Sequence, residues 1–405
     1  MPETRVPRGG KVRLGTVNGD LRVDNHARIE VDGRLVVSGD VRFEGNSEVS
    51  GPLECHHFRC EGGTVTVQGD LVVHGDMEAE DAAIDVHGSL NARRVDVDRG
   101  LRVSGAATAD RFEIGGVLEG GEALTARTIS VGGKFRLAGK LEAQDVEVGG
   151  SVELHDVSID RLEVGGLIRI GGGEVRHSIE VGGRFLAEGP LTFGSLDVGG
   201  FAEFRDLAKG GSIDVGGVFT AARDVIFTSL EIGGVGRIGG DGTGHEVEIG
   251  GKFDVRGAFA LTGRVEVGGA IGVGGAFTGD KLEVGGKLEA LRAVFVDSVE
   301  IGGAAQTREG LKAARIRLEH RSRVSGPVVG EDVQLERGAR VEEVYGQRVD
   351  VGERCEARRV VAVNVRVRAG ASVGEVVYTG SADIDPGARL GAPARKVDAL
   401  PPFPL

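Results

Sequence analysis

One short word recurs along this chain: a β-branched or leucine residue, an acid, another β-branched residue and two glycines. It reads VEVGG at 146–150, IEVGG at 179–183, VEIGG at 247–251 and LEVGG at 282–286. A binding loop or a catalytic turn needs such a word once. Repetition at a fixed period indicates a stack of equal structural units, each of which buries its apolar face against its neighbours.

The period is close to 17 residues. From Phe112 onward the first residue of the word recurs at intervals of 16, 17 or 18 residues. The positions are Phe112, Ile129, Val146, Leu162, Ile179, Leu196, Ile213, Leu230, Val247, Val265, Leu282, Val299, Ile316, Val333, Val349, Val365 and Ala382. Upstream we place Val12, Ile29, Ser47 and Val65 in the same register, with two shortened turns in an irregular stretch around 68–95. This gives about 23 turns.

Each repeat contains three pairs of apolar residues at positions i and i+2. The repeat from Leu282 has Leu282/Val284, then Leu288/Ala290, then Val294/Val296. Such pairs point to one face of a strand. We therefore predict an all-β fold, a three-sided parallel β-solenoid that we expect to be right-handed. The glycine pairs, found mainly in 115–303, follow the first strand, where we expect tight corners with positive φ.

We expect one continuous solenoid over 12–391, with a leader or cap at 1–11 and a Pro-rich tail or cap at 392–405. The ends of any solenoid present unpaired strand edges, which must be covered or must pair with another molecule. Capped ends predict a monomer, and a free end predicts a polymer. The side chains expected to cap or join the ends are Val12, Leu14, Leu390, Leu400, Phe403 and Leu405.

Composition favours a cytoplasmic protein. The chain has three cysteines, no N-terminal apolar run that resembles a signal peptide, and no apolar stretch of membrane-spanning length. The net charge of −13 argues against binding to nucleic acid. One segment is more basic than the rest: residues 308–368 contain 14 Lys or Arg against 10 Asp or Glu.

The acids of the repeated word must point outward. They predict an acidic ladder of Glu147, Glu163, Glu180, Asp197, Asp214, Glu231, Glu248, Glu266, Glu283 and Glu300. Such a ladder could bind cations or a basic partner. We favour a solvated face whose repulsion is relieved by basic residues just past the corner, such as Lys134, Arg184, Lys252 and Lys287.

Motifs for chemistry are weak. Cys55, His57 and Cys60 are residue types that bind zinc, but their spacing is loose and they lie within the repeat, where inward cysteines fill the core. We therefore predict no metal site, no catalytic residues and no cofactor. Solenoid enzymes either keep strict six-residue units or carry long loops with carboxylates and aromatic residues. This chain has a period of 17, short loops and only two Tyr.

The phrases VEVGGSVELHDVSIDRLEVGG (146–166) and LEVGGKLEALRAVFVDSVEIGG (282–303) resemble the bactofilins, or polymer-forming cytoskeletal proteins. The resemblance extends from about Val12 to Gly391. It implies a scaffold that assembles end to end without nucleotide and organises other cytoskeletal or envelope proteins. The chain departs from the family pattern in its long solenoid, and no N-terminal membrane anchor is visible, so we do not expect membrane association.

These observations predict a non-enzymatic structural protein that polymerises with itself. They leave open whether copies join head to head and tail to tail or head to tail. The alternative is a monomeric rod that serves as a spacer, an adhesin or a partner-binding surface. A solenoid enzyme is the least favoured function.

Overall fold

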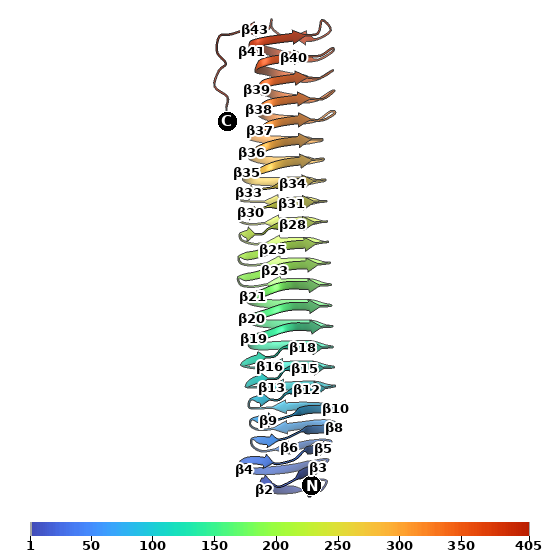
Figure 1. Cartoon of the computed structure of the whole chain (residues 1–405). Coiled ribbons are helices and arrows are strands. Elements are labelled where there is room, and N and C mark those ends of the chain that lie inside the picture. The colour runs from blue at the N-terminus through green and yellow to red at the C-terminus, as the bar shows by residue number, and fades with distance from the viewer. Residues whose placement is uncertain (1, 405) are drawn as a thin grey trace. The chain divides into compact units, whose positions relative to one another are not determined.

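The computed structural model describes residues 2–404, in which strands and turns are present and no helix occurs. The fold is a parallel β-solenoid of about 23 turns with roughly 17 residues per turn, as the sequence predicts. Within each of the two units described below, Figure 1 shows the strands stacked turn upon turn. The chain divides into two compact units, residues 1–201 and 202–405, and each is described by itself.

In the first unit the strands are β1 (Glu3–Val6), β2 (Lys11–Val17), β3 (Asp20–Asp24), β4 (Ala27–Val37), β5 (Val41–Glu44), β6 (Ser47–Val49), β7 (Leu53–Cys55), β8 (Phe58–Val67), β9 (Leu71–Val73), β10 (Asp76–Val86), β11 (Leu90–Asn91), β12 (Arg94–Val97), β13 (Gly100–Val103), β14 (Ala106–Thr108), β15 (Arg111–Ile114), β16 (Val117–Gly120), β17 (Ala123–Thr125), β18 (Thr128–Val131), β19 (Lys134–Val148), β20 (Ser151–Val164), β21 (Leu167–Val181), β22 (Arg184–Ala187) and β23 (Leu191–Val198).

From Phe201 onward the strands are β24 (Phe201–Phe204), β25 (Ala208–Val215), β26 (Val218–Ala221), β27 (Val225–Ile226), β28 (Ser229–Ile232), β29 (Val235–Ile238), β30 (Gly242–Gly244), β31 (Glu246–Ile249), β32 (Lys252–Val255), β33 (Phe259–Leu261), β34 (Arg264–Val267), β35 (Ala270–Val284), β36 (Lys287–Ile301), β37 (Ala304–Leu318), β38 (Arg323–Leu335), β39 (Arg340–Val351), β40 (Glu356–Val367), β41 (Ser372–Ile384), β42 (Arg389–Leu390) and β43 (Arg395–Lys396).

Each turn has three faces. Face 1 carries the repeated word and precedes the corner, as in β15; face 2 follows the corner, as in β16; face 3 closes the turn, as in β17. The three strands pair in parallel with the next turn, where Phe112 meets Ile129, Leu118 meets Phe135 and Leu124 meets Leu141. Equal displacement of 17 residues on all three faces confirms the three-sided solenoid.

The core is a stack of inward side chains that alternate with outward, mostly polar ones along each strand. In the repeat from Leu282 the third inward pair is Ala293/Phe295, which corrects the expected Val294/Val296, since Val296 is 76% exposed. The largest fully buried side chains of the core are phenylalanines, among them Phe253, Phe259 and Phe277. The ring centroids of Phe253 and Phe259 are 5.5 Å apart, and those of Phe259 and Phe277 are 5.6 Å apart. These buried rings fill space between the Val, Ile and Leu side chains of the core, whereas Phe201 is 56% exposed.

The pairing corrects the register expected for the first turns. Val12 pairs with Ile29, and this column runs through Val49, Val67 and Val86 on face 2. The column of Phe112 leads back instead through Val95, Met77, Phe58, Val41 and Leu21 to Thr4 on face 1. The two expected short turns are therefore absent from the described chain. The error arose because every face carries i, i+2 apolar pairs, so the period alone does not identify the face.

The corner glycines have a different cause from the one expected. None of the pairs from Gly115–Gly116 to Gly302–Gly303 is among the described glycines with positive φ. Space decides instead: a Cβ on Gly133 would lie 2.5 Å from the Gly116 carbonyl oxygen, and one on Gly286 would lie 1.9 Å from that of Gly269. At the second glycine of these pairs the backbones of successive corners approach so closely that a Cβ does not fit, whereas the first glycine of some pairs, such as Gly285, leaves 3.4 Å.

After β37 the corners widen from two residues to four, as between Leu335 and Arg340. The Ala339 N–H donates to the Glu336 carbonyl at 3.0 Å, and Gly338 takes a left-handed conformation with φ 77°. The first corner, 7–10, has the same width, and there the Gly10 N–H donates to the Pro7 carbonyl at 2.9 Å. Four-residue corners therefore occur at both ends of the chain.

Candidate functional site

The solenoid begins within residues 1–11, the segment expected to be a leader or cap, which corrects that expectation. β1 pairs in register with β3, so residues 3–6 already form face 1 of the first turn. β1 and β2 each pair on one side, with β3 and β4, and no described strand occupies their other edge. Val12 and Leu14 are half-buried, whereas Ile29, the partner of Val12, is fully buried. Val6 and Val17, inward residues of the same turn, are only 1% and 4% exposed, so this end of the core is partly open.

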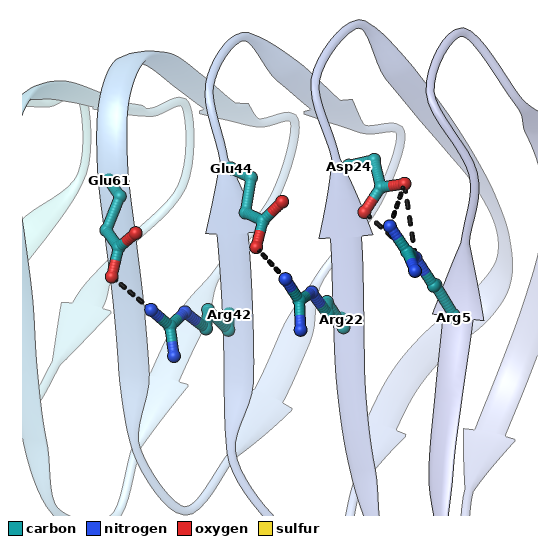
Figure 2. Close-up of polar contacts among 6 residues, drawn as sticks. All are labelled: Arg5, Arg22, Asp24, Arg42, Glu44 and Glu61. Carbon is teal, nitrogen blue, oxygen red and sulfur yellow. Dashed lines mark hydrogen bonds and ion pairs between the residues drawn. The ribbon is translucent and has the colours of Figure 1, made fainter.

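A ladder of ion pairs holds the outside of these first turns together. Arg5, Arg22, Arg42 and Arg59 stack in one column of face 1. The guanidinium of Arg5 donates to the carboxylate of Asp24 one turn on, with Nη2 2.9 Å from Oδ2, and Arg22–Glu44 and Arg42–Glu61 repeat the pattern (Figure 2). Pairing with the adjacent acidic column offsets the repulsion within the arginine column.

The C-terminal end is open in a similar way. The last face 1 segment is Ser381–Ile384 of β41, and no described strand pairs with its outer edge. Ala382 and Ile384 are half-buried, while their partners Val365 and Val367 are only 3% and 1% exposed. Leu390, expected at this end, lies in β42 and is also half-buried.

The C-terminal tail lies along the side of the solenoid, which corrects the expectation that it covers the end. β43 pairs with Val377–Tyr378, and the chain then turns back past β41 toward β38 (Figure 1). Val397, Leu400 and Phe403 pack against an apolar column on the outside of face 3, which we call the lateral ladder: Val329, Tyr345, Val361 and Val377. Leu405 lies outside the described residues.

The lateral ladder is well covered. Its four side chains are 0–5% exposed, and the ring centroid of Phe403 lies 5.6 Å from that of Tyr345. The Tyr345 hydroxyl donates to Glu343 at 2.6 Å, and burial together with this hydrogen bond raises the pKa of Tyr345. The sequence offered a signal that we missed: in each of these turns two apolar residues are adjacent, as in Val328–Val329, and the second must face outward.

The acidic ladder forms as predicted within each unit. Glu147 pairs with Glu163, Glu163 with Glu180 and Glu180 with Asp197, and in the second unit the column runs from Asp214 to Glu300. The expected relief by basic residues past the corner is wrong for Lys252 and Lys287, which pair with Asp254 and Glu289. Arg264 contacts the ladder instead, 2.8 Å from Glu266 and 2.9 Å from Glu283.

In the more basic segment, 308–368, arginines form ion pairs with acidic side chains of the same segment. Arg340 contacts Glu356 at 3.3 Å, Arg348 contacts Asp332 at 3.2 Å, and Arg368 contacts Asp350 at 2.7 Å. These pairs join successive turns, so the surplus of arginine in 308–368 contributes to cross-turn ion pairs.

The weak metal candidates lie in the wall of the solenoid. Cys55 and Cys60 are 1% and 2% exposed, and they stack on Val73 and Ala79 of the next turn. Burial raises the pKa of both thiols to about 12, which disfavours the thiolate that a metal requires. The Nδ1 of His57 accepts the Asp76 N–H at 3.0 Å. Within residues 2–404 no three His, Cys, Asp or Glu side chains are grouped to hold a metal ion.

The fold and its ends define a parallel β-solenoid protein whose terminal turns have unpaired edges. Comparisons with family models, curated proteins and solved structures find no match. No described segment forms a helix with the length and apolarity that crossing a membrane requires.

Proposed function

We propose that the protein is a non-enzymatic scaffold that assembles end to end with itself without nucleotide, as the bactofilins do. The observation that carries the proposal is the pair of open ends. Half-buried apolar side chains, Val12 and Leu14 at one end and Ile384 and Leu390 at the other, lie beside unpaired strand edges. Edges of this kind pair readily with another strand.

The position of the tail supports the same function. A tail over the last turn would compete with assembly, but Leu400 and Phe403 pack on the lateral ladder and leave Ser381–Ile384 uncovered. We further propose a cytoplasmic location. Copies of the chain are then its first partner, and other cytoskeletal or envelope proteins are further partners of the assembled scaffold. We propose no role in binding nucleic acid.

A monomeric spacer or partner-binding solenoid is the second candidate, and one observation favours it. Pro2 and Pro7 flank β1. Proline has no N–H to donate to an added strand and is a common means of blocking an edge.

Sedimentation over a range of protein concentrations, with electron microscopy and no added nucleotide, tests the proposal. We expect assemblies that grow with concentration, and we expect Leu14→Glu and Leu390→Glu to reduce them because a carboxylate would enter the contact. Val235→Glu is the matched control, since Val235 is 46% exposed in β29, away from the ends. Monomers at every concentration would contradict the proposal and favour the spacer.

A further inference from the structure

The two ends of the chain have matching corners. The first corner, 7–10, and the last, 385–388, both contain four residues, and in both the fourth residue's N–H donates to the carbonyl of the first at 2.9 Å. The Gly-Gly corners differ, because Gly133 donates its N–H to Gly116 of the turn before. Stacked turns need corners of similar shape, and these two share their length and this hydrogen bond. They differ at the third residue, where Gly9 has a positive φ of 68° and Gly387 does not.

The order of the faces also matches. The last turn leaves face 1 uncovered at Ser381–Ile384, and the chain begins with a face 1 strand, β1. In both segments the outward residue lies between two inward positions: Arg5 between Thr4 and Val6, and Asp383 between Ala382 and Ile384. A β1 strand added in parallel would therefore continue the register of the turn below it.

The charges at the two ends are opposite. Residues 1–17 contain four basic side chains and one acid, and residues 372–391 contain three acids and one basic side chain. Arg5 and Asp383 both have exposed side chains, 59% and 76%. Opposite charges favour contact between unlike ends and disfavour contact between like ends.

We propose that copies join head to tail, with β1 of one copy laid on Ser381–Ile384 of the next and Arg5 above Asp383. This inference rests on the proposed end-to-end assembly and assigns its polarity. Lys11 would then lie above Arg389, a like-charge neighbour that the solenoid already accepts where Arg323 pairs with Arg340.

One hydrogen bond fits the junction and another is missing from it. At an internal wide corner the left-handed third residue donates its N–H to the carbonyl of the second corner residue in the next turn, as Gly338 does to Glu353 at 2.9 Å. At the last corner the Gly387 N–H donates instead to Asp385 Oδ1 at 2.7 Å. In the junction, the carbonyl of Arg8 of the added copy would be the acceptor for this N–H. Pro7, by contrast, lacks the N–H that Asp385 donates to Val367 at 2.9 Å. The junction is thus weaker than an internal turn.

Cysteine cross-linking tests the polarity. In register, residues 5 and 383 of two copies would lie about 4.8 Å apart at Cα, within the range of a disulfide. The native Cys55, Cys60 and Cys355 are buried. We expect Arg5→Cys/Asp383→Cys to form a ladder of covalent oligomers on mild oxidation, and an equimolar mixture of the single variants to form dimers. Neither single variant alone should cross-link, nor should the control Glu147→Cys.

The outcomes separate the two proposals. Cross-linked dimers of Arg5→Cys alone or of Asp383→Cys alone would overturn the polarity and leave end-to-end assembly standing. Monomers in sedimentation for every variant would overturn both. A second variant needs no cross-link: Pro7→Ser restores the missing donor, and under head-to-tail joining it should strengthen association about fivefold, the effect of one net hydrogen bond. Unchanged or weaker association of Pro7→Ser would count against the junction.

Discussion

Within the second unit, the turns with Gly-Gly corners, up to Gly302–Gly303, contrast with the five wide-cornered turns that follow. Both kinds carry the same inward pairs, and the register passes from Val299 to Ile316 without a break. Their corners use glycine differently. At Gly286 a Cβ would lie 1.9 Å from a backbone oxygen, whereas at Gly338 the nearest atom would be the Arg321 Cγ at 3.5 Å.

The difference shows that glycine serves two separate needs in one repeat. The Gly-Gly corners need the space, and the wide corners need the left-handed conformation. The second need is less strict, since Arg321 and Arg354 occupy the same corner position as Gly338 with φ of 60° and 55°. An L-residue there costs on the order of 1–2 kcal/mol.

The largest expected effect is that of a methyl group in a Gly-Gly corner. Gly286→Ala should lower the free energy of unfolding by about 3 kcal/mol, because the stacked carbonyl must move to make room. Hydrogen exchange read turn by turn is the suitable measurement, since a repeat array unfolds locally as well as globally. Protection should fall most in the strands that flank the corner, β35 and β36.

Gly338→Ala is the matched control in the wide-cornered region. It adds the same methyl group where space is free, so we expect only the dihedral cost, about 1 kcal/mol. Equal losses for the two variants would show that the two kinds of corner do not differ in the way described.

A second, smaller effect concerns the outer surface of the wide-cornered turns. These turns carry the lateral ladder. Phe403→Ala should reduce the protection of β38 to β41 by about 1–2 kcal/mol, because it uncovers Tyr345 and its neighbours. Val296→Ala is the control, since this outward valine of β36 is 76% exposed and should change stability by less than about 0.5 kcal/mol. If both variants behave alike, the tail contributes nothing to these turns.

Much of the fold could be predicted because the information is repeated. The inward pairs, the period and the acidic ladder recur in so many turns that local exceptions do not hide them. Three features escaped prediction for physical reasons. Val12 could not be assigned to a face, since all faces bear the same pairs; the glycine pairs could not reveal whether space or φ required them; and the lateral course of Leu400 and Phe403 depends on a surface that only stacking creates.

The candidate site was predicted in part. Open ends follow from any solenoid, so the location of Val12, Leu14 and Leu390 near the ends could be predicted from the sequence, and their role in assembly stays a prediction. The correspondence between Arg5 and Asp383 could not be predicted from the sequence, because it depends on knowing which face the first and last strands occupy. Because the first turns were assigned to the wrong face, Arg5 was placed in the expected leader rather than in a strand of the solenoid.

The smallest expected effect lies at the boundary between the two regions, where the acidic ladder ends. Glu300 pairs in register with Arg317, the first residue of its column in the wide-cornered turns. Burial, and then the adjacent Glu319 carboxyl, raise the pKa of Glu300. Since its pKa is higher in the folded than in the unfolded state, stability is greatest while the group is protonated and falls as pH rises through the folded-state pKa.

Glu300→Gln replaces the ionised carboxylate by a neutral amide and removes the loss of stability that ionisation of Glu300 causes. The variant should therefore be more stable than the original chain at pH 7. The side chain is 36% exposed, and after solvent screening we expect a gain of about 0.5 kcal/mol that vanishes near pH 4. Thermal unfolding followed from about pH 4 to pH 8 measures it. Glu283→Gln, one rung back, loses an ion pair with Arg264 at 2.9 Å and should show no gain. If Glu300→Gln is neutral or destabilising at pH 7, then the ion pair with Arg317 already compensates the charge of Glu300. The boundary between the two regions would then carry no electrostatic destabilisation.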